Sequence, residues 1–282
     1  MTLDPAIVAL VLLAALMHAG WNAVVKMGND RLLALLLIKA PTILVAVATL
    51  AVVGPPAPAS WPYLLVSTGI SIGYFYFLVR AYHAGDLSVA YPVARGSAPI
   101  ATLILSFLIA GEQPSFASAA GVLIVSAGIV ALGWQRGAVK GHAATVLWAM
   151  AVGLTIAGYT ISDGIGARVS ANPIGYAAAL NILTGILIAV AAFALRRGAA
   201  IDALRHGWRK GLAGGMLMFG GYAIVIYALT LAPMASIAAL RETGVIFAAL
   251  IGTMALRERF GARRIAASIL VAVGLAILVG GV

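Results

Sequence analysis

Residues 31–53 read RLLALLLIKAPTILVAVATLAVV, a run in which only Arg31 and Lys39 are charged. About 20 apolar residues are enough for a helix to cross the hydrocarbon core of a bilayer, so this stretch predicts a transmembrane helix. The rest of the chain has the same character, with 63% hydrophobic and 9% charged residues. Soluble domains contain roughly 45–50% apolar and about 25% charged residues. The composition therefore excludes a water-soluble globular protein.

Charged residues, Gly and Pro divide the 282-residue chain into ten apolar spans. The spans cover residues 6–26, 31–53, 61–82, 88–110, 115–134, 142–163, 173–195, 211–231, 235–256 and 261–281. We expect all of them to be helices, because a backbone inside hydrocarbon must satisfy its own hydrogen bonds and the alternation of a membrane barrel is missing. The first span has no cationic segment before it, and we expect it to be retained rather than cleaved. Ten crossings use about 200 residues, which leaves no room for a soluble domain.

The formal net charge is +10, with 18 Lys and Arg against 8 Asp and Glu. The basic residues lie mostly in short loops, which argues against the continuous basic face that binds nucleic acid. Loops after even-numbered spans hold only Arg168, whereas loops after odd-numbered spans hold most of the rest. Because short cytoplasmic loops are enriched in Lys and Arg, we expect both termini on the periplasmic side of a bacterial inner membrane.

The chain matches itself without gaps at a shift of 146 residues, which pairs spans 4 and 5 with spans 9 and 10. The match pairs Arg95 with Arg241, Ile100 with Ile246, Glu112 with Glu258 and Gly128 with Gly274. Five spans per unit force the two halves into opposite orientations, as in many secondary transporters. The sequence thus predicts an all-α polytopic membrane protein with ten transmembrane helices in two inverted five-helix repeats, residues 1–136 and 137–282.

The segment LIAGE at residues 108–112, followed by Gly121 and Gly128, is echoed by MALRE at residues 254–258, followed by Gly274. Together with the ten spans, these segments resemble the EamA branch of the drug/metabolite transporter superfamily, and within it the YddG-like bacterial exporters of amino acids and related metabolites. The resemblance implies a basket of helices around a central cavity, with spans 1, 3, 4, 6, 8 and 9 as its walls. Members of that branch are usually drawn with cytoplasmic termini, and the loop charges here indicate the reverse.

Charged residues inside the spans are the first candidates for a substrate site, because ionisable groups in a bilayer usually face a partner or a wet cavity. Arg95 and Arg241 are symmetry mates in the repeat, and a guanidinium fork suits a substrate carboxylate. The alternative is a structural ion pair with Glu242. We take Glu242 as the only carboxylate well within a span, where it could meet a substrate amine, exchange a proton, or form a static lock with an arginine. Glu112 and Glu258 lie at helix ends, as caps or partners in the repeat.

Polar and aromatic residues complete the candidate set. His18 and Asn22 share one face of the first span, and each could contact substrate or simply satisfy hydrogen bonds between helices. We expect Asn181 to bridge helices. Tyrosines can enclose an apolar side chain or form interfacial belts. The candidate substrate-binding residues are His18, Asn22, Tyr74, Tyr91, Arg95, Tyr159, Tyr222, Arg241 and Glu242.

The sequence favours a secondary transporter over an enzyme. No phosphate-binding loop of the type that binds ATP is present, no Cys is available for catalysis or metal binding, and the four His are scattered. We therefore expect no cofactor, no metal and no catalytic residues. The expected function is export of small metabolites, above all amino acids, by alternating access. An importer or a multidrug or cation efflux pump of the same fold is the alternative, and a membrane-embedded enzyme is a weaker one. The expected partners are a small-molecule substrate and the lipid bilayer, and we expect a monomer.

Overall fold

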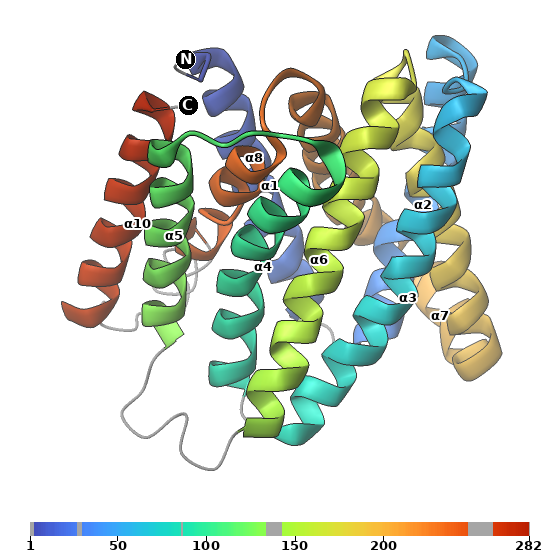
Figure 1. Ribbon diagram of the computed structural model, residues 1–282. Helices are drawn as coiled ribbons and strands as arrows, with labels where there is room; N and C mark the ends of the chain where they lie inside the picture. The colour runs from blue at the N-terminus through green and yellow to red at the C-terminus, as the bar shows by residue number, and fades with distance from the viewer. Residues whose placement is uncertain (1–2, 27–29, 86, 134–142, 248–261, 282) are drawn as a thin grey trace.

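A computed structural model describes residues 3–26, 30–85, 87–133, 143–247 and 262–281, and these residues form helices and short connections without a strand (Figure 1). The elements are α1 (Pro5–Lys26), α2 (Arg31–Val53), the short 3₁₀ helix η1 (Pro58–Ser60), α3 (Trp61–Ala84), α4 (Leu87–Ala110), α5 (Phe116–Gly133), α6 (Ala143–Val169), α7 (Pro173–Leu231), α8 (Met234–Arg241) and α10 (Ala262–Gly280). The predicted all-α class is confirmed. Six of the described helices, α1, α2, α3, α4, α6 and α7, are long and apolar enough to cross a membrane.

The helices pack side by side as a bundle (Figure 1). The helix α5 packs against α10. Both α3 and α4 pack against α6, and α2 packs against α7. The two ends of the described chain lie together, because the backbone N–H of Leu3 donates to the carbonyl oxygen of Val279 over 3.2 Å. Both ends therefore lie at the same end of the bundle, as an even number of crossings requires.

Polar residues between the spans fix where helices begin. The carboxylate of Asp30 accepts hydrogen bonds from the backbone N–H groups of Leu32 and Leu33, over 2.9 and 3.2 Å, and so caps α2. Asn172 caps α7 in the same way by accepting from Gly175 over 2.9 Å. Its amide nitrogen also donates to the carbonyl of Gly54, which joins the start of α7 to the end of α2.

The segment expected to be a loop between spans 7 and 8 is helical, so that part of the prediction is wrong. The helix α7 runs from Pro173 to Leu231, and only Arg196 has non-helical angles, with φ −143° and ψ 34°. Residues 196–210 are rich in Ala and Arg, which have high helix propensity. The two spans are therefore two helical segments of α7 that meet at the kink at Arg196.

The short helix α8 ends at the charged residues. Its last residue is Arg241, Glu242 follows as the cap, and residues 242 and 243 form a turn before the helix resumes. The backbone N–H of Thr243 donates to the carbonyl of Leu240, and that of Val245 to the carbonyl of Glu242, which is the tighter three-residue pattern. The rest of span 9 lies within residues 248–261, outside the described residues. The count of ten crossings therefore stays a prediction.

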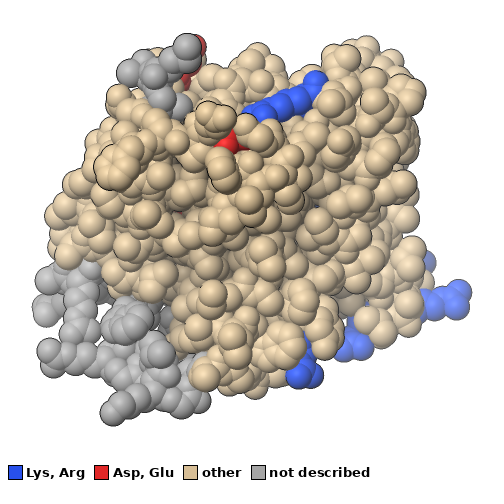
Figure 2. Space-filling model, viewed as in Figure 1, with Lys and Arg blue, Asp and Glu red and all other residues tan. Residues whose placement is uncertain are grey.

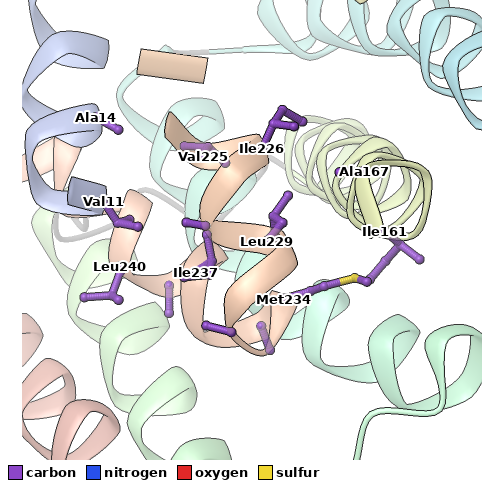
Figure 3. Close-up of a cluster of buried hydrophobic side chains, with 14 of the residues drawn as sticks. Val11, Ala14, Ile161, Ala167, Val225, Ile226, Leu229, Met234, Ile237 and Leu240 are labelled. Atoms are coloured by element: carbon purple, nitrogen blue, oxygen red, sulfur yellow. The ribbon is translucent and has the colours of Figure 1, made fainter. Parts of the chain in front are cut away.

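A buried apolar cluster surrounds α8 and holds it inside the bundle (Figure 3). It joins Met234, Ile237 and Leu240 of α8 to Val11 of α1 and to Leu229 of α7, and all five are at most 1% exposed. The outer surface is apolar too: Leu44 is 74% and Phe116 is 91% exposed. Apolar side chains both inside and outside are what a helix bundle in lipid requires.

Glycines allow α5 and α10 to approach closely. A Cβ atom at Gly128 would lie 2.6 Å from Cγ2 of Val271, and one at Gly274 would lie 2.8 Å from the backbone nitrogen of Val125. Any larger residue would push the two helices apart, because these are distances that real Cβ atoms do not adopt. Small residues play this role at helix contacts in membranes, where lipid offers no hydrophobic drive for association.

Charged side chains concentrate at the ends of the bundle. In Figure 2 the broad middle of the visible face carries none. Blue and red side chains lie near its upper end, and other blue side chains lie along its lower edge, near the end of α3 and the lower end of α7. A charge-free belt between charged ends is the pattern of a protein surrounded by hydrocarbon.

Candidate substrate-binding site

The central feature of the site is an ion pair between Arg95 of α4 and Glu242 at the end of α8. Nε of Arg95 lies 2.8 Å from Oε2 of Glu242. Arg95 is 7% and Glu242 is 1% exposed, so the pair is buried inside the bundle. Because one residue comes from each predicted repeat, the pair joins the two halves of the chain.

The local sequence of α4 loosens the helix around Arg95. Pro92 and Pro99 both lie within α4, and proline has no N–H to donate. The carbonyl of Arg95 therefore lacks its usual partner four residues later, at Pro99. A helix weakened on both sides of a buried charge can bend there, which is how kinks arise at proline.

Arg241 lies on the other side of Glu242. Its Nη2 is 3.8 Å from Oε1 of Glu242, and the side chain is 5% exposed. Within the part of the chain that the structure describes, its Nε and Nη2 have no hydrogen-bond partner. A buried donor without an acceptor costs roughly 1–3 kcal/mol, so this edge of the guanidinium is suited to an incoming acceptor.

His18 of α1 completes the charged cluster. Its Nε2 lies 3.2 Å from Nη2 of Arg95, and its ring meets that of Trp21 edge to face at 5.0 Å. A guanidinium can only donate, so Nε2 must accept and the imidazole is neutral in this arrangement. Asn22 points elsewhere, because its amide donates to the carbonyl of His18 over 2.8 Å within the same helix.

Four candidate tyrosines surround the charges. The guanidinium of Arg95 lies 6.0 Å from the ring centre of Tyr91, and the rings of Tyr74 and Tyr159 meet edge to face at 6.4 Å. Tyr159 and Tyr222 lie near enough to Arg241 for its charge to act on their hydroxyl groups. The structure thus brings together all of the predicted residues except Asn22, whose amide is turned to its own helix. They come from α1, α3, α4, α6, α7 and the end of α8.

One functional candidate escaped the sequence reasoning. Asp163 of α6 is 0% exposed, so the expectation that Glu242 is the only carboxylate well within a span is wrong. Span 6 was predicted to end at residue 163, whereas α6 continues to Val169. The spacing of Tyr159 and Asp163 by four residues, which places both on one helix face, is the signal that could have revealed it.

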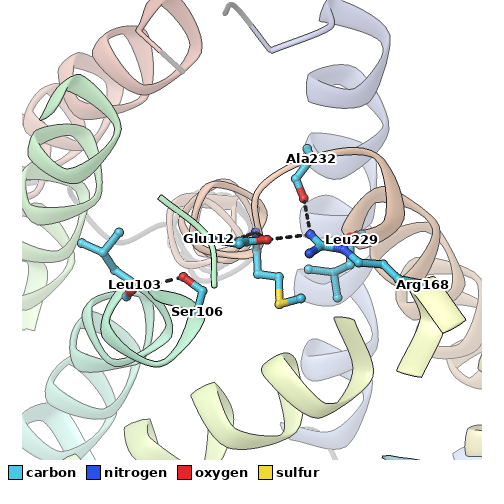
Figure 4. A network of polar contacts seen from close by, with 7 residues as sticks. Leu103, Ser106, Glu112, Arg168, Leu229 and Ala232 are labelled. Atoms are coloured by element: carbon cyan, nitrogen blue, oxygen red, sulfur yellow. Dashed lines mark hydrogen bonds and ion pairs between the residues drawn. The ribbon is translucent and has the colours of Figure 1, made fainter. Parts of the chain in front are cut away.

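A second polar network lies at the end of the bundle where the termini lie (Figure 4). Nη2 of Arg168 lies 2.6 Å from Oε1 of Glu112, and its guanidinium also donates to the carbonyls of Leu229 and Ala232. Glu112 accepts from the backbone N–H of Met234 over 2.9 Å at the start of α8. The expected capping role of Glu112 is confirmed, while Glu258 lies outside the described residues.

Asn181 and Lys39 form a separate bridge between α7 and α2. Nζ of Lys39 donates to the side chains of Asn181 and Thr184 over 2.9 Å each, and the amide of Asn181 donates to the carbonyl of Thr42 over 3.1 Å. The expected helix-bridging role of Asn181 is confirmed.

Two described hollows lie away from the charged cluster. One is a groove of about 890 Å³ with a largely apolar lining from α4, α5, α6 and α10. The other, of about 340 Å³, lies beside Glu112 and Arg168. Neither includes Arg95 or Arg241, and with exposures of 7% and 5% these two side chains are covered by protein in this conformation.

Comparisons with known proteins address the fold and the family. Residues 143–280 match the model of the EamA-like transporter family. None of the curated proteins matches the chain significantly. Chains of solved structures do match, and one, described as "Crystal structure of protein", is 19% identical with a TM-score of 0.76. That alignment covers 97% of this chain and 98% of the other. At this identity the likeness shows the fold alone.

Proposed function

Because residues 143–280 belong to the EamA-like transporter family, we propose that the chain is a secondary transporter that exports amino acids across a bacterial inner membrane. Membership of this family makes the protein a membrane transporter of the drug/metabolite type rather than a member of an enzyme family. The substrate class, the direction and the membrane belong to our proposal.

The unpartnered edge of Arg241 is the observation that carries the choice of substrate. Nε and Nη2 form one edge of the guanidinium, and this edge can donate two parallel hydrogen bonds to the two oxygens of a carboxylate. Both nitrogens lack a hydrogen-bond partner among the described residues, in a side chain that is 5% exposed, and Nη2 has only the distant ion-pair contact with Glu242 at 3.8 Å. A substrate carboxylate would satisfy both donors at once.

Glu242 supplies the complementary charge for a substrate ammonium group. At present it is bound by Arg95, at 2.8 Å. In the proposed cycle the ammonium group takes the place of Arg95, which keeps His18 as an acceptor at 3.2 Å. The resting ion pair is thus exchanged for an ion pair between Glu242 and the substrate, and the buried guanidinium of Arg95 keeps only the neutral imidazole of His18 as its acceptor.

The surrounding residues shape the pocket. The rings of Tyr74, Tyr91, Tyr159 and Tyr222 would enclose an apolar substrate side chain while their hydroxyls meet its polar end. His18 belongs to the wall that α1 contributes, whereas the amide of Asn22 is hydrogen-bonded within its own helix. The proposed cycle moves two inverted halves, residues 1–136 and 137–282, relative to each other. It is driven by an ion gradient or by the gradient of the substrate itself, in a monomer.

The orientation follows from the loop charges. We place both termini on the periplasmic side, which agrees with their common location at one end of the bundle. A reporter that is active only in the periplasm, fused to the N-terminus, tests this orientation and should be active. Activity of a reporter that works only in the cytoplasm, at the same position, would show the opposite orientation.

Counterflow in proteoliposomes tests the function. Vesicles loaded with an unlabelled amino acid should accumulate the labelled form when they contain the wild-type protein. Arg241→Ala should abolish exchange. Arg241→Lys keeps the charge but loses the planar fork, and should raise the apparent KM at least tenfold. Arg209→Ala removes an exposed arginine of α7 and serves as the matched control.

The outcomes separate the alternatives. Exchange of bulky organic cations without exchange of any amino acid would make the protein a cation efflux pump. Full exchange activity of Arg241→Ala would show that Arg241 does not bind the substrate carboxylate. Cells that overproduce the protein should release a labelled amino acid faster, and faster uptake instead would make it an importer.

A further inference from the structure

Asp163 lies beside the proposed substrate site, and the cycle described above does not use it. Its Oδ1 accepts a hydrogen bond from the hydroxyl of Tyr176 over 3.0 Å, and its Oδ2 accepts from the hydroxyl of Tyr222 over 2.5 Å. The two tyrosines belong to the two segments of α7 that meet at the kink at Arg196. One fully buried carboxylate of α6 therefore holds both segments.

No Lys or Arg in the described ranges forms an ion pair with this carboxylate. The groups that face it are Tyr176 and Tyr222 of α7, Tyr159 of its own helix, Ser67 of α3 and Arg241 of α8. Arg241 is the cation whose charge reaches it. Ionisable residues in such a position within a membrane are expected to serve a pathway for substrate or protons.

Tyrosine hydroxyls can satisfy Asp163 in either protonation state. A phenol both donates and accepts, so it can donate to a carboxylate and accept from a carboxylic acid. A guanidinium only donates, so Glu242 beside Arg95 has no such freedom. Asp163 can therefore gain and lose a proton without leaving a buried polar group unpaired, provided that one hydroxyl turns.

We propose that Asp163 is a proton-binding site that takes up one proton when a substrate carboxylate binds to Arg241. This inference rests on the proposed function. The substrate carboxylate neutralises the guanidinium whose charge reaches Asp163, so the carboxylate of Asp163 loses its electrostatic support. An O–H bond then forms between an oxygen of Asp163 and a proton from the water on the side of the membrane to which the site is open. On the other side the substrate leaves and the proton returns to water.

Release of Tyr222 strengthens the link. In the anionic state its hydroxyl donates to Asp163. When Asp163 is protonated, this hydroxyl is free to donate to the substrate carboxylate that is bound at Arg241. Proton and substrate then favour each other's binding, and by linkage the effect is reciprocal. Substrate and proton therefore cross the membrane together, and export is driven by the gradient of the substrate itself.

Proteoliposomes that contain a pH-sensitive dye test this inference. The probe is an amino acid that exchanges in the counterflow assay, added outside the vesicles. With wild-type protein the lumen should acidify, with about one proton moved per amino acid. The apparent affinity of the protein for the amino acid should rise as the pH falls, by at most about tenfold per pH unit for one linked proton. In Asp163→Asn the ratio of protons to amino acid should fall to zero. Asp202→Asn changes an exposed aspartate, 76% accessible in its side chain, and is the matched control.

The results distinguish this inference from the function on which it rests. Wild-type exchange without proton movement, or Asp163→Asn with an unchanged proton ratio, would overturn the proton site and leave the transporter intact. A dependence on sodium instead of protons would overturn it as well. No exchange by the wild type would instead overturn the proposed function. If Asp163→Asn does not fold, Tyr176→Phe removes one donor and keeps the ring. Tyr176→Phe should change the pH dependence of the affinity for the amino acid, and an unchanged pH dependence would count against the proposal.

Discussion

At the scale of single residues, one buried carboxylate is shared by two guanidinium groups. Glu242 lies 2.8 Å from Arg95 and 3.8 Å from Arg241. All three side chains are at most 9% exposed, so each charge depends on the others. Removal of one partner of a buried pair typically destabilises a protein by about 3–5 kcal/mol.

Arg95→Gln should therefore lower the thermal unfolding temperature of the detergent-solubilised protein. It leaves the carboxylate of Glu242 buried with only the more distant Arg241. The double variant with Glu242→Gln should lose less than the sum of the two single losses, because the carboxylate that lacked a close partner is then gone. Thermal unfolding of the two single variants and the double variant measures the coupling. Strictly additive losses would show that the two residues are not energetically coupled.

The sequence made the charged residues easy to find but not their pairing. Arg95, Arg241 and Glu242 stand out because spans contain so few charges. The closer partner of Glu242 is Arg95 from another helix, which depends on how α4 and α8 pack, and a sequence pattern carries no information on that register. Asp163 was missed because a boundary at residue 163 made a buried carboxylate look like the end of a span.

At the scale of elements, the start of α8 is held by the network of Glu112 and Arg168 (Figure 4). Glu112 accepts from the N–H of Met234, and Arg168 joins it to the end of α7. Deeper in the same contact, the hydroxyls of Ser118 and Ser236 lie 3.3 Å apart and are buried. We interpret this network as the closure of the bundle at the end where the termini lie.

Glu112→Gln should open that end more often, because a neutral amide binds the guanidinium of Arg168 more weakly than a carboxylate does. The chain has no Cys, so Ser236→Cys provides a single thiol behind the network. Its rate of labelling by a membrane-impermeant maleimide should rise several-fold in the Glu112→Gln background. Gln113→Asn is the control at the adjacent position. Equal labelling rates of Ser236→Cys with and without Glu112→Gln would show that the network does not close this end of the bundle.

Helix boundaries were predictable where polar caps mark them. The span predicted at residues 31–53 coincides with α2, which Asp30 caps. The continuous α7 was not predictable from charge, because residues 196–210 combine a cationic surface with good helix formers. The interruption of span 9 at Glu242 was not predicted, because Gly244 is the one local signal after the turn and a single Gly within an apolar span does not by itself break a helix.

At the scale of the whole molecule, two features support a transporter that works between two halves. The ion pair of Arg95 and Glu242 joins residues from the two predicted repeats, and closely packed glycines join α5 to α10, which the repeat also pairs. The charged ends and charge-free middle of the outer face that Figure 2 shows match the expected membrane belt. Composition alone predicted that belt, because it reflects hydrophobicity rather than packing.

The most direct test of the account is a structure of the protein with a transported amino acid bound. We expect the substrate carboxylate within hydrogen-bond distance of Nε and Nη2 of Arg241, and its ammonium group on Glu242 in place of Arg95. A substrate bound elsewhere, for example in the groove between α4, α5, α6 and α10, with the contact of Arg95 and Glu242 unchanged, would contradict the account.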